Sequence, residues 1–312
     1  MNRILLIGSL AYDRIMVFPG LFKDHFLAEG LHNINVSFSV STPEIVFGGC
    51  AGNIGYSLAL LGGSPEILAT AGNDFADYEE HLKENGIATT GIEIINDLPT
   101  ASCYITTDKA DNQITAFSAG ADEQGYTLPF ETARVSLAIV SPTGTEDMRR
   151  FPERFREAGV PYLFDPGQQI PMLSGDDLKS AITGALGLIV NDYELALVLE
   201  KTGWSEQDIV DACQTLIVTL GEKGSRVRTG DDEITVPAVP AVEVVDPTGA
   251  GDAFRAGLLH GLSSGISLEE SLRLASTVAT YAVECYGTQN HRFTLDELSA
   301  RYESTYQTPF PL

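Results

Sequence analysis

Short apolar runs along the chain alternate with longer stretches in which apolar side chains return every three or four positions. The runs are typical of buried strands, and the periodic stretches are typical of helices with one face turned to a core. Strands are expected over residues 3–10, 65–71, 135–141, 161–165, 186–191 and 216–221. Helices are expected over residues 53–61, 75–85 (capped by Asp74), 146–158, 176–184, 192–200, 205–213, 250–263, 267–286 and 294–303. The alternation predicts a mostly parallel sheet covered on both faces, with its sites beyond the carboxyl ends of the strands.

Two regions, residues 12–47 and 97–118, break this rhythm because they contain strand-like segments with no helix between them. Apolar and polar residues alternate over 34–40 and 101–105, and turn-forming residues at 108–112 follow the second segment. This pattern is typical of antiparallel strands with one face in solvent. Since both regions leave the main sheet near its early strands, we expect a single β-sheet lid, with two unrelated surface hairpins as the alternative. The large α/β nucleotide-binding domain is then formed by residues 1–11, 48–96 and 119–312, and the lid by residues 12–47 and 97–118.

The charge of the chain narrows the choice of partners. Its 43 acidic and 19 basic residues give a net charge of −24. Such a surface repels nucleic acid and anionic lipid, so we expect neither as a partner, and a bound phosphate has to be neutralised locally by a cation or by backbone amides. The four scattered cysteines form no CxxC pair, the N-terminal apolar run is too short for a signal peptide, and no run approaches about 20 apolar residues. We therefore expect a cytoplasmic protein with free thiols and no membrane span.

The segment Val244–Phe254 combines the features of a phosphate site. The small residues Gly249, Ala250 and Gly251 stand between a β-rich stretch and a periodic helix. Small residues let a ligand approach the backbone, and the free N–H groups of a first helical turn favour an anion there. Asp252 in that turn is placed to accept a proton from an attacking hydroxyl group, although an acid that only complements the helix dipole is the alternative. The combination predicts phosphoryl transfer with Asp252 as the catalytic base.

Other nucleotide-binding motifs are missing from the chain. It has no GxxxxGK[ST] P-loop, no protein-kinase signature set and no GxGxxG fingerprint that opens a helix after the first strand. These absences exclude a P-loop kinase and a protein kinase, and they disfavour a nucleotide-binding oxidoreductase.

Four motifs together resemble the ribokinase-like family of carbohydrate kinases, also called the PfkB family. In chain order they are GGCAGN at 48–53, NDYE at 191–194, TLGEKG at 219–224 and DPTGAGD at 246–252. The resemblance runs along essentially the whole chain, and the last motif is the most specific. It implies a ribokinase-like three-layer α/β/α sandwich with a mostly parallel central sheet, a small β-sheet lid, and ATP-dependent phosphorylation of a hydroxymethyl group.

The resemblance assigns roles around the transferred phosphoryl group. Asp252 is implied to deprotonate the acceptor hydroxyl, while the backbone amides of residues 249–251 hold the phosphoryl group. Asn191 and Glu194 are implied to organise Mg²⁺ with the ATP phosphates through water, which suits magnesium's reluctance to dehydrate. A helix cap and a solvated acid are the alternative for this pair.

Further positions are implied to contact the nucleotide or a monovalent cation. Thr219, Gly221 and Gly224 match nucleotide-contacting positions, although a Thr-x-Gly sequence is common. Asp246 and Thr248 match positions whose backbone carbonyls hold K⁺ in some relatives, and the sequence leaves open whether this chain uses K⁺.

The acceptor side of the site is implied by an early group of residues. Asp13 matches an acid that binds sugar hydroxyls at the end of the first strand, and a turn residue is its alternative. Gly48, Gly49 and Asn53 match the segment that lies against the sugar, where a plain turn before a helix is the alternative.

Three further segments resemble bacterial adenosine kinases, while the D-x-N-x-R pattern of many sugar kinases is absent. Gln168 and Gln169 are suited to read a purine edge, because an amide donates and accepts at once, and Phe117 is suited to stack on the base. A polar loop and ordinary packing of the lid are the alternatives for these residues. The three segments are residues 113–121, residues 165–169 with a D-P-x-Q-Q pattern, and residues 284–289 with an E-x-x-G-T-Q pattern.

The expected activity is transfer of the ATP γ-phosphoryl group to the 5′-hydroxyl of adenosine, with Mg²⁺. A sugar kinase of the ribokinase or fructokinase type and a non-catalytic ligand-binding protein on the same scaffold are the alternatives. The lid sheet either pairs across a homodimer or serves as the mobile cover of the site.

Overall fold

The structure is a computed structural model that describes residues 3–25, 36–110 and 112–312. Its larger sheet has the strand order β13-β12-β11-β10-β9-β8-β1-β4-β5. All neighbours in this sheet pair in parallel except β11 with β12 and β12 with β13, which form an antiparallel edge. The strands are β1 (Arg3–Ile7), β4 (Ser64–Gly72), β5 (Ile92–Ile95), β8 (Val135–Val140), β9 (Tyr162–Phe164), β10 (Gly187–Asn191), β11 (Thr215–Thr219), β12 (Ser225–Thr229) and β13 (Asp232–Val236).

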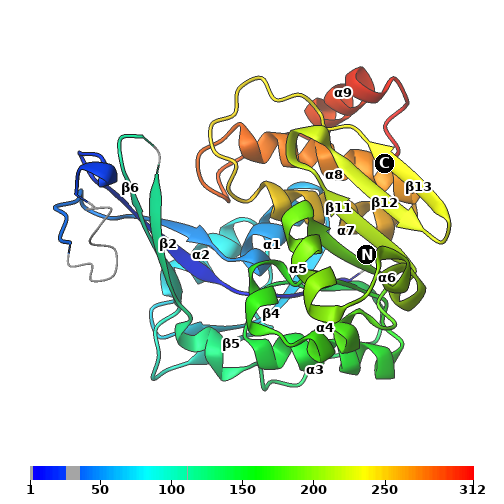
Figure 1. Cartoon of the computed structure of the whole chain (residues 1–312), viewed down its shortest axis with the longest axis horizontal. Coiled ribbons are helices and arrows are strands. Elements are labelled where there is room, and N and C mark those ends of the chain that lie inside the picture. Colours follow the sequence, from blue (N-terminus) through cyan, green and yellow to red (C-terminus); the bar gives the residue numbers. More distant parts are fainter. Residues whose placement is uncertain (1–2, 26–35, 111) are drawn as a thin grey trace.

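Helices cover both faces of this sheet, which makes the three-layer α/β/α architecture that the sequence predicts (Figure 1). One face carries α1 (Cys50–Leu60), α2 (Ala76–Glu84), α7 (Ala250–Ser264) and α8 (Leu268–Val283), with α9 (Leu295–Tyr306) packed on α8. The other face carries α3 (Thr145–Ala158), α4 (Gly175–Ile182), α5 (Asp192–Thr202) and α6 (Glu206–Cys213). Short 3-10 turns lie at η1 (Phe22–Asp24), η3 (Gly120–Gln124), η4 (Gly167–Met172) and η5 (Gly221–Lys223). None of the described helices is long and apolar enough to cross a membrane.

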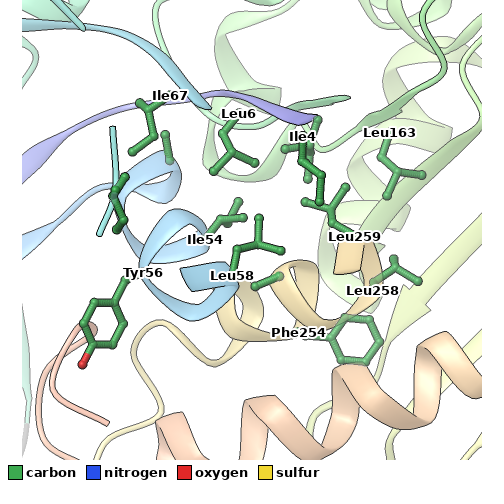
Figure 2. Packing of buried hydrophobic residues seen from close by; sticks show 14 of the residues in the cluster. Ile4, Leu6, Ile54, Tyr56, Leu58, Ile67, Leu163, Phe254, Leu258 and Leu259 are labelled. Atoms are coloured by element: carbon green, nitrogen blue, oxygen red, sulfur yellow. The ribbon is translucent and has the colours of Figure 1, made fainter. Parts of the chain in front are cut away.

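Strand β1 contributes to both hydrophobic cores, because successive side chains of a strand point to opposite faces. Ile4 and Leu6 pack with residues of α1 and α7, among them Ile54 and Leu258 (Figure 2). Leu5 and Ile7 belong to the core on the opposite face. A strand buried on both sides reads as a continuous apolar run, which explains why the sequence pattern located it.

A second, four-stranded sheet projects from one side of this body (Figure 1). Its order is β3-β2-β6-β7, with β2 and β6 parallel and the outer pairs antiparallel. Every residue of β7 is exposed, whereas β2 and β6 are partly buried. The strands are β2 (Ala11–Val17), β3 (Glu44–Gly48), β6 (Ala101–Thr107) and β7 (Gln113–Ser118).

Two local predictions are wrong. The alternating segment 34–40 is not a strand over its described part, residues 36–40, and the strand of this region is β3. The ring of Phe38 packs against Phe18 at 4.8 Å and Phe22 at 5.2 Å between ring centroids, so the apolar position serves a small aromatic cluster. Residues 34 and 35 lie outside the described residues.

Asp74 does not cap helix α2, whose N-cap residue is Phe75. The Asp74 carboxylate instead accepts a hydrogen bond from the backbone amide of Thr100 at 2.7 Å, and so joins the large sheet to the start of β6. The sequence pattern also omits β5, β12 and β13, which are short strands at the two ends of the sheet.

Candidate active site

A cavity of about 480 Å³ lies where the two sheets meet, at the carboxyl ends of the central parallel strands. The large sheet contributes residues at or just after its strand ends, as expected for this class of fold. The small sheet contributes Ala11, Asp13, Cys103 and Phe117. The strand-end residues are Ser9 after β1, Pro142 after β8, Asp165 after β9, Asn191 in β10 and Thr219 in β11.

The start of helix α7 forms the part of the wall that is best suited to an anion. Gly249 is the N-cap residue in a left-handed conformation, with φ of 79°. The amides of Gly249, Gly251 and Asp252 have no hydrogen-bond acceptor among the described residues, and all three residues line the cavity. Ala250 departs from the prediction, because its amide donates to the carbonyl of Pro247 at 3.3 Å and the residue does not line the cavity. Three free donors at the positive end of the helix dipole remain to hold a phosphoryl group.

The Asp252 carboxylate lies beside these amides. Its Oδ2 accepts a hydrogen bond from Asn53 Nδ2 at 2.8 Å, which fixes the side chain between α7 and α1. Burial raises the pKa of Asp252 to about 6, although Asn53 and the Arg255 guanidinium partly oppose the shift. A carboxylate with this pKa is ionised at neutral pH and yet basic enough to accept a proton.

A buried hydrogen-bond network supports Asn53 from behind. Gln289 Nε2 donates to Asn53 Oδ1 at 2.9 Å and lies 2.6 Å from the hydroxyl oxygen of Tyr78. The Tyr78 hydroxyl donates to the carbonyl of Gly48 at 2.7 Å, and His81 Nε2 lies 3.1 Å from Gln289 Oε1. The chain of bonds therefore connects Asp252 to the end of β3 in the small sheet. Sequence reasoning marked Gln289 only as part of a motif and gave no signal for Tyr78 or His81.

Asp165 and Arg255 form a buried ion pair that sequence reasoning missed. Arg255 Nε and Nη2 donate to the two Asp165 carboxylate oxygens at 2.5 Å and 2.7 Å, and both residues line the cavity. Arg255 lies three positions after Asp252, and residues at that spacing share a helix face. This spacing is the signal in the sequence that identifies Arg255 as a site residue.

On the acceptor side, Asp13 lines the cavity, and burial together with the negative charge of Asp246 raises its pKa to about 6. Gly48 does not line the cavity; a Cβ atom there would lie 2.6 Å from Asp13 Oδ2, so the glycine leaves room for that carboxylate. Gly49 does line it, with φ of 86°. A Cβ atom on Gly49 would lie 2.6 Å from the carbonyl oxygen of Ser9, because two chain connections between the sheets cross there.

The predicted base-binding residues are only partly brought together. Phe117 lines the cavity from β7 and is 52% exposed, so its ring is available to a ligand rather than buried in the lid. Gln168 also lines the cavity, and its Nε2 lies 3.8 Å from Cys50 Sγ. Gln169, the next residue of the same η4 turn, does not line the cavity. Cys50 and Cys103 are cavity residues that sequence reasoning did not single out.

On the nucleotide side, Asn191 and Glu194 line the cavity and cap helix α5 reciprocally. Asn191 Oδ1 accepts from the Glu194 amide at 2.7 Å, and Glu194 Oε2 accepts from the Asn191 amide at 2.8 Å. Thr219 and Gly221 line the cavity next to them. Gly224 does not; it has φ of 94° in the turn before β12, where a Cβ atom would lie 2.0 Å from a backbone oxygen.

Only one of the two residues that were matched to a K⁺ site lines the cavity. Thr248 lines the cavity, whereas Asp246 does not. The Asp246 carboxylate accepts from the backbone amides of Thr248 at 2.9 Å and Gly287 at 3.1 Å, so its side chain orders the turn that precedes α7.

The chain is similar to known kinases along nearly its whole length. The profile of the pfkB family carbohydrate kinases matches residues 1–294. A nucleoside kinase of Methanocaldococcus jannaschii is 31% identical over 308 residues, covering 97% of each chain. The structure of a Burkholderia thailandensis nucleoside kinase in complex with inosine superposes with a TM-score of 0.88 at 41% identity, covering 98% of this chain and 99% of that one. The same enzyme in complex with ADP-inosine gives a TM-score of 0.85 at 42% identity.

The free amides at the start of α7, the carboxylate beside them and the two-sheet architecture thus occur in a chain that matches the family profile over nearly its full length. The protein belongs to the pfkB family of carbohydrate kinases and is a phosphotransferase that uses ATP and acts on a hydroxyl group.

Proposed function

We propose that the protein phosphorylates the 5′-hydroxyl of a nucleoside, with adenosine as the leading acceptor and Asp252 as the catalytic base. The observation that carries the proposal is the position of the Asp252 carboxylate beside three free backbone amides in one cavity. The relatives named as nucleoside kinases, and the neighbour bound to inosine, support a nucleoside over a free sugar. Other relatives are named as cytidine kinase and aminoimidazole riboside kinase, so the acceptor screen has to identify the preferred nucleobase.

The transfer follows from the arrangement of the cavity. Asp13 accepts hydrogen bonds from the ribose hydroxyls, and Phe117 stacks on the base. Asp252 takes the proton of the 5′-hydroxyl as its oxygen attacks the γ-phosphorus. The amides of Gly249 and Gly251 hold the phosphoryl oxygens as charge shifts toward ADP.

The residues on the nucleotide side fit a magnesium site. Glu194 Oε2 is occupied by helix capping, while no hydrogen bond to Oε1 is made by the described residues. Burial raises the pKa of Glu194, and a nearby cation would stabilise its charged form. Glu194 and Asn191 would hold Mg²⁺ through water, where the ion supplies neutralising charge to the ATP phosphates.

A monovalent cation such as K⁺ has a suitable place in the turn before α7. The backbone carbonyls of Asp246 and Thr248 accept no hydrogen bond from the described part of the chain. The Asp246 side chain fixes the turn that carries them. Carbonyl oxygens bound to a cation there would strengthen the anion site at the start of α7 from behind.

The small sheet is proposed to close over the acceptor, and to pair with a second copy of the chain. Ile45, Tyr104 and Ile114 lie on one face of this sheet and expose between 41% and 54% of their surface, an apolar face that fits such pairing. Light scattering of the purified protein tests the pairing, and a monomer at all concentrations would contradict it. A salvage role in the cytoplasm completes the proposal.

The test is an acceptor screen that measures ADP release with MgATP, with and without K⁺. We expect the largest kcat/KM with adenosine, lower values with inosine and cytidine, and the lowest with ribose and fructose. Phosphorus NMR of the product identifies the 5′-monophosphate. A preference for ribose or fructose would replace the acceptor by a sugar, and binding without ADP release for any compound would indicate a non-catalytic protein.

A further inference from the structure

The cavity carries an excess of negative charge that opposes binding of ATP, and the free amides at the start of α7 offset only part of it. Four carboxylates line it, those of Asp13, Asp165, Glu194 and Asp252. A nucleoside triphosphate is strongly anionic, and like charges in a partly enclosed cavity repel one another strongly. Arg255 is the only basic side chain among the residues that line the cavity within the described ranges. The rest of the molecule does not neutralise the triphosphate either, since the net charge of the chain is −24.

The guanidinium group of Arg255 is held in one orientation. Asp165 binds it through two parallel hydrogen bonds, at 2.5 Å and 2.7 Å, and Nη1 donates to the carbonyl of Gly251 at 3.1 Å. Three of its five N–H donors are thereby used. One N–H on Nη1 and one on Nη2 have no acceptor among residues 3–25, 36–110 and 112–312. Only 7% of the residue is exposed, and the residue lines the cavity.

These two donors lie at the same helix end as the free amides. Arg255 follows Asp252 by three positions on α7, and its contact to Gly251 places the guanidinium beside the first turn. Its charge acts on Asp165, Asp252 and Glu194, and all three line the cavity. The guanidinium is therefore held in the same cavity as the proposed base and Glu194, where negative charge moves in the proposed transfer.

We propose that Arg255 is a catalytic residue that donates its two free N–H groups to the γ-phosphoryl group in the transition state, and that Asp165 is the positioning residue that orients it. The inference rests on the transfer described under the proposed function. A bond forms between the acceptor oxygen and the γ-phosphorus while the bond from that phosphorus to the bridging oxygen breaks. The acceptor proton goes to Asp252, and ADP leaves with the electron pair. Arg255 neutralises charge on the equatorial oxygens without taking or giving a proton.

A purely structural ion pair is the competing explanation, because removing one partner of a buried pair destabilises a protein whatever its function. The double variant Arg255→Met/Asp165→Leu reduces this difficulty, since neither member of the pair is left as a buried charge without its partner. The matched control is Arg226→Met/Glu206→Gln. That pair also has two parallel bonds, at 2.7 Å and 2.9 Å, and it lies outside the cavity.

The measurement compares kcat, ligand affinity and melting temperature in both double variants, using the acceptor that the wild-type protein turns over fastest. We expect the Arg255 double variant to lose about 10²–10³-fold in kcat while its Kd for ADP and for the acceptor changes by less than about threefold. The control should keep kcat within about threefold. A kcat within about threefold of wild type in the Arg255 double variant would overturn the proposal, as would an equal loss of kcat and of ADP affinity.

Two readouts that a structural role would not move complete the test. In Arg255→Ala, added guanidinium ion should raise kcat at least about tenfold, because Asp165 remains to hold it. ADP with aluminium fluoride and acceptor should bind the double variant about 10²-fold more weakly than wild type, while ADP alone binds equally. Absence of both effects would refute the role of Arg255. If the acceptor proves to be a sugar, or if Asp252 proves dispensable, these two readouts still report on Arg255 alone.

Discussion

The start of helix α7 and strand β7 approach the same cavity and are built in opposite ways. At α7 the functional groups are enclosed, and Asp252 and Arg255 each have hydrogen-bond partners on other elements. Along β7 every residue is exposed, and the Phe117 ring is 52% exposed. Chemistry depends on fixed distances, whereas recognition by a cover depends on an element that is free to move. Changes at α7 should therefore lower kcat, and changes at β7 should raise KM.

The largest effect is expected for Asp252→Asn, which keeps the hydrogen bond from Asn53 but removes the base. We expect kcat to fall about 10²–10⁴-fold with an unchanged Kd for the acceptor. Steady-state kinetics and calorimetry measure both quantities. The matched control is Asp122→Asn, since Asp122 is also buried with a pKa raised to about 6 but lies outside the cavity. A kcat near that of wild type in Asp252→Asn would show that Asp252 is not the catalytic base.

The second effect concerns the network behind the base. Gln289→Leu keeps the approximate volume but removes the bonds to Asn53 and Tyr78. Asn53 then loses its fixed orientation, and we expect kcat to fall about 10–100-fold. Kinetics together with the melting temperature separates this loss from unfolding. If KM rose while kcat stayed constant, Gln289 would contribute to acceptor binding and not to the alignment of Asp252.

The third effect tests the other half of the comparison. Phe117→Ala should raise the KM for a nucleoside about tenfold, since stacking on one base contributes about 1–3 kcal/mol, and kcat should change by less than about threefold. Ile114→Ala on the same strand is the control, because Ile114 is 41% exposed and does not line the cavity. A fall of kcat in Phe117→Ala would show that β7 also positions the reacting atoms.

The fourth effect is the pH dependence of kcat/KM. Asp252 and Asp13 both have a pKa raised to about 6, and the proposed transfer requires both in the ionised form. Activity should rise with pH through about 6 and level off above 7, with a value at pH 5 at least about tenfold below the plateau. A profile that stays flat down to pH 4.5 would contradict the raised pKa of both groups.

The smallest effect is on stability. The pKa of Asp252 in the folded protein, about 6, exceeds its ordinary value of 3.8, so the folded state binds the proton more tightly than the unfolded chain. Stability is therefore lost as pH rises from about 4 to 6, and the full penalty is present at pH 7.5. Asn at position 252 removes that penalty and should add about 1–3 kcal/mol to the free energy of unfolding at pH 7.5, with a smaller gain at pH 4.5. Urea unfolding of Asp252→Asn at the two pH values tests this, and a loss of stability at pH 7.5 would contradict it.

The difference between the two regions also explains what the sequence revealed. The α/β body was predictable because its strands are buried on both faces and leave continuous apolar runs such as residues 4–7. Asp252 and the free amides were predictable because a single local motif holds them. Position 38 misled the strand prediction, because an apolar residue in an alternating pattern fits an aromatic cluster as well as a sheet.

The supporting residues lie beyond local pattern. Tyr78 and Gln289 are 211 positions apart, and Asp165 and Arg255 are 90 apart. No local periodicity records such contacts, since they arise only when helices and loops from distant segments converge on one edge of the sheet. Spacing along one helix is different: the separation of three positions from Asp252 to Arg255 contained the information needed to find the second residue.

At Gly49 the connection from β3 to α1 passes directly beside the connection from β1 to β2. This arrangement bears on whether ATP is transferred to an acceptor or hydrolysed by water. Gly49 is the N-cap residue of α1, and its carbonyl accepts the amide of Asn53, the residue that holds Asp252. The small sheet, proposed as the cover, and Asp252, proposed as the base, are thus connected through Gly49, so we expect an open cover to leave the Asp252 carboxylate poorly aligned. We expect slow ATP hydrolysis in the absence of acceptor. A water molecule is too small to contact the small sheet and stabilise its closed position, so the Asp252 carboxylate would not be aligned to activate that water.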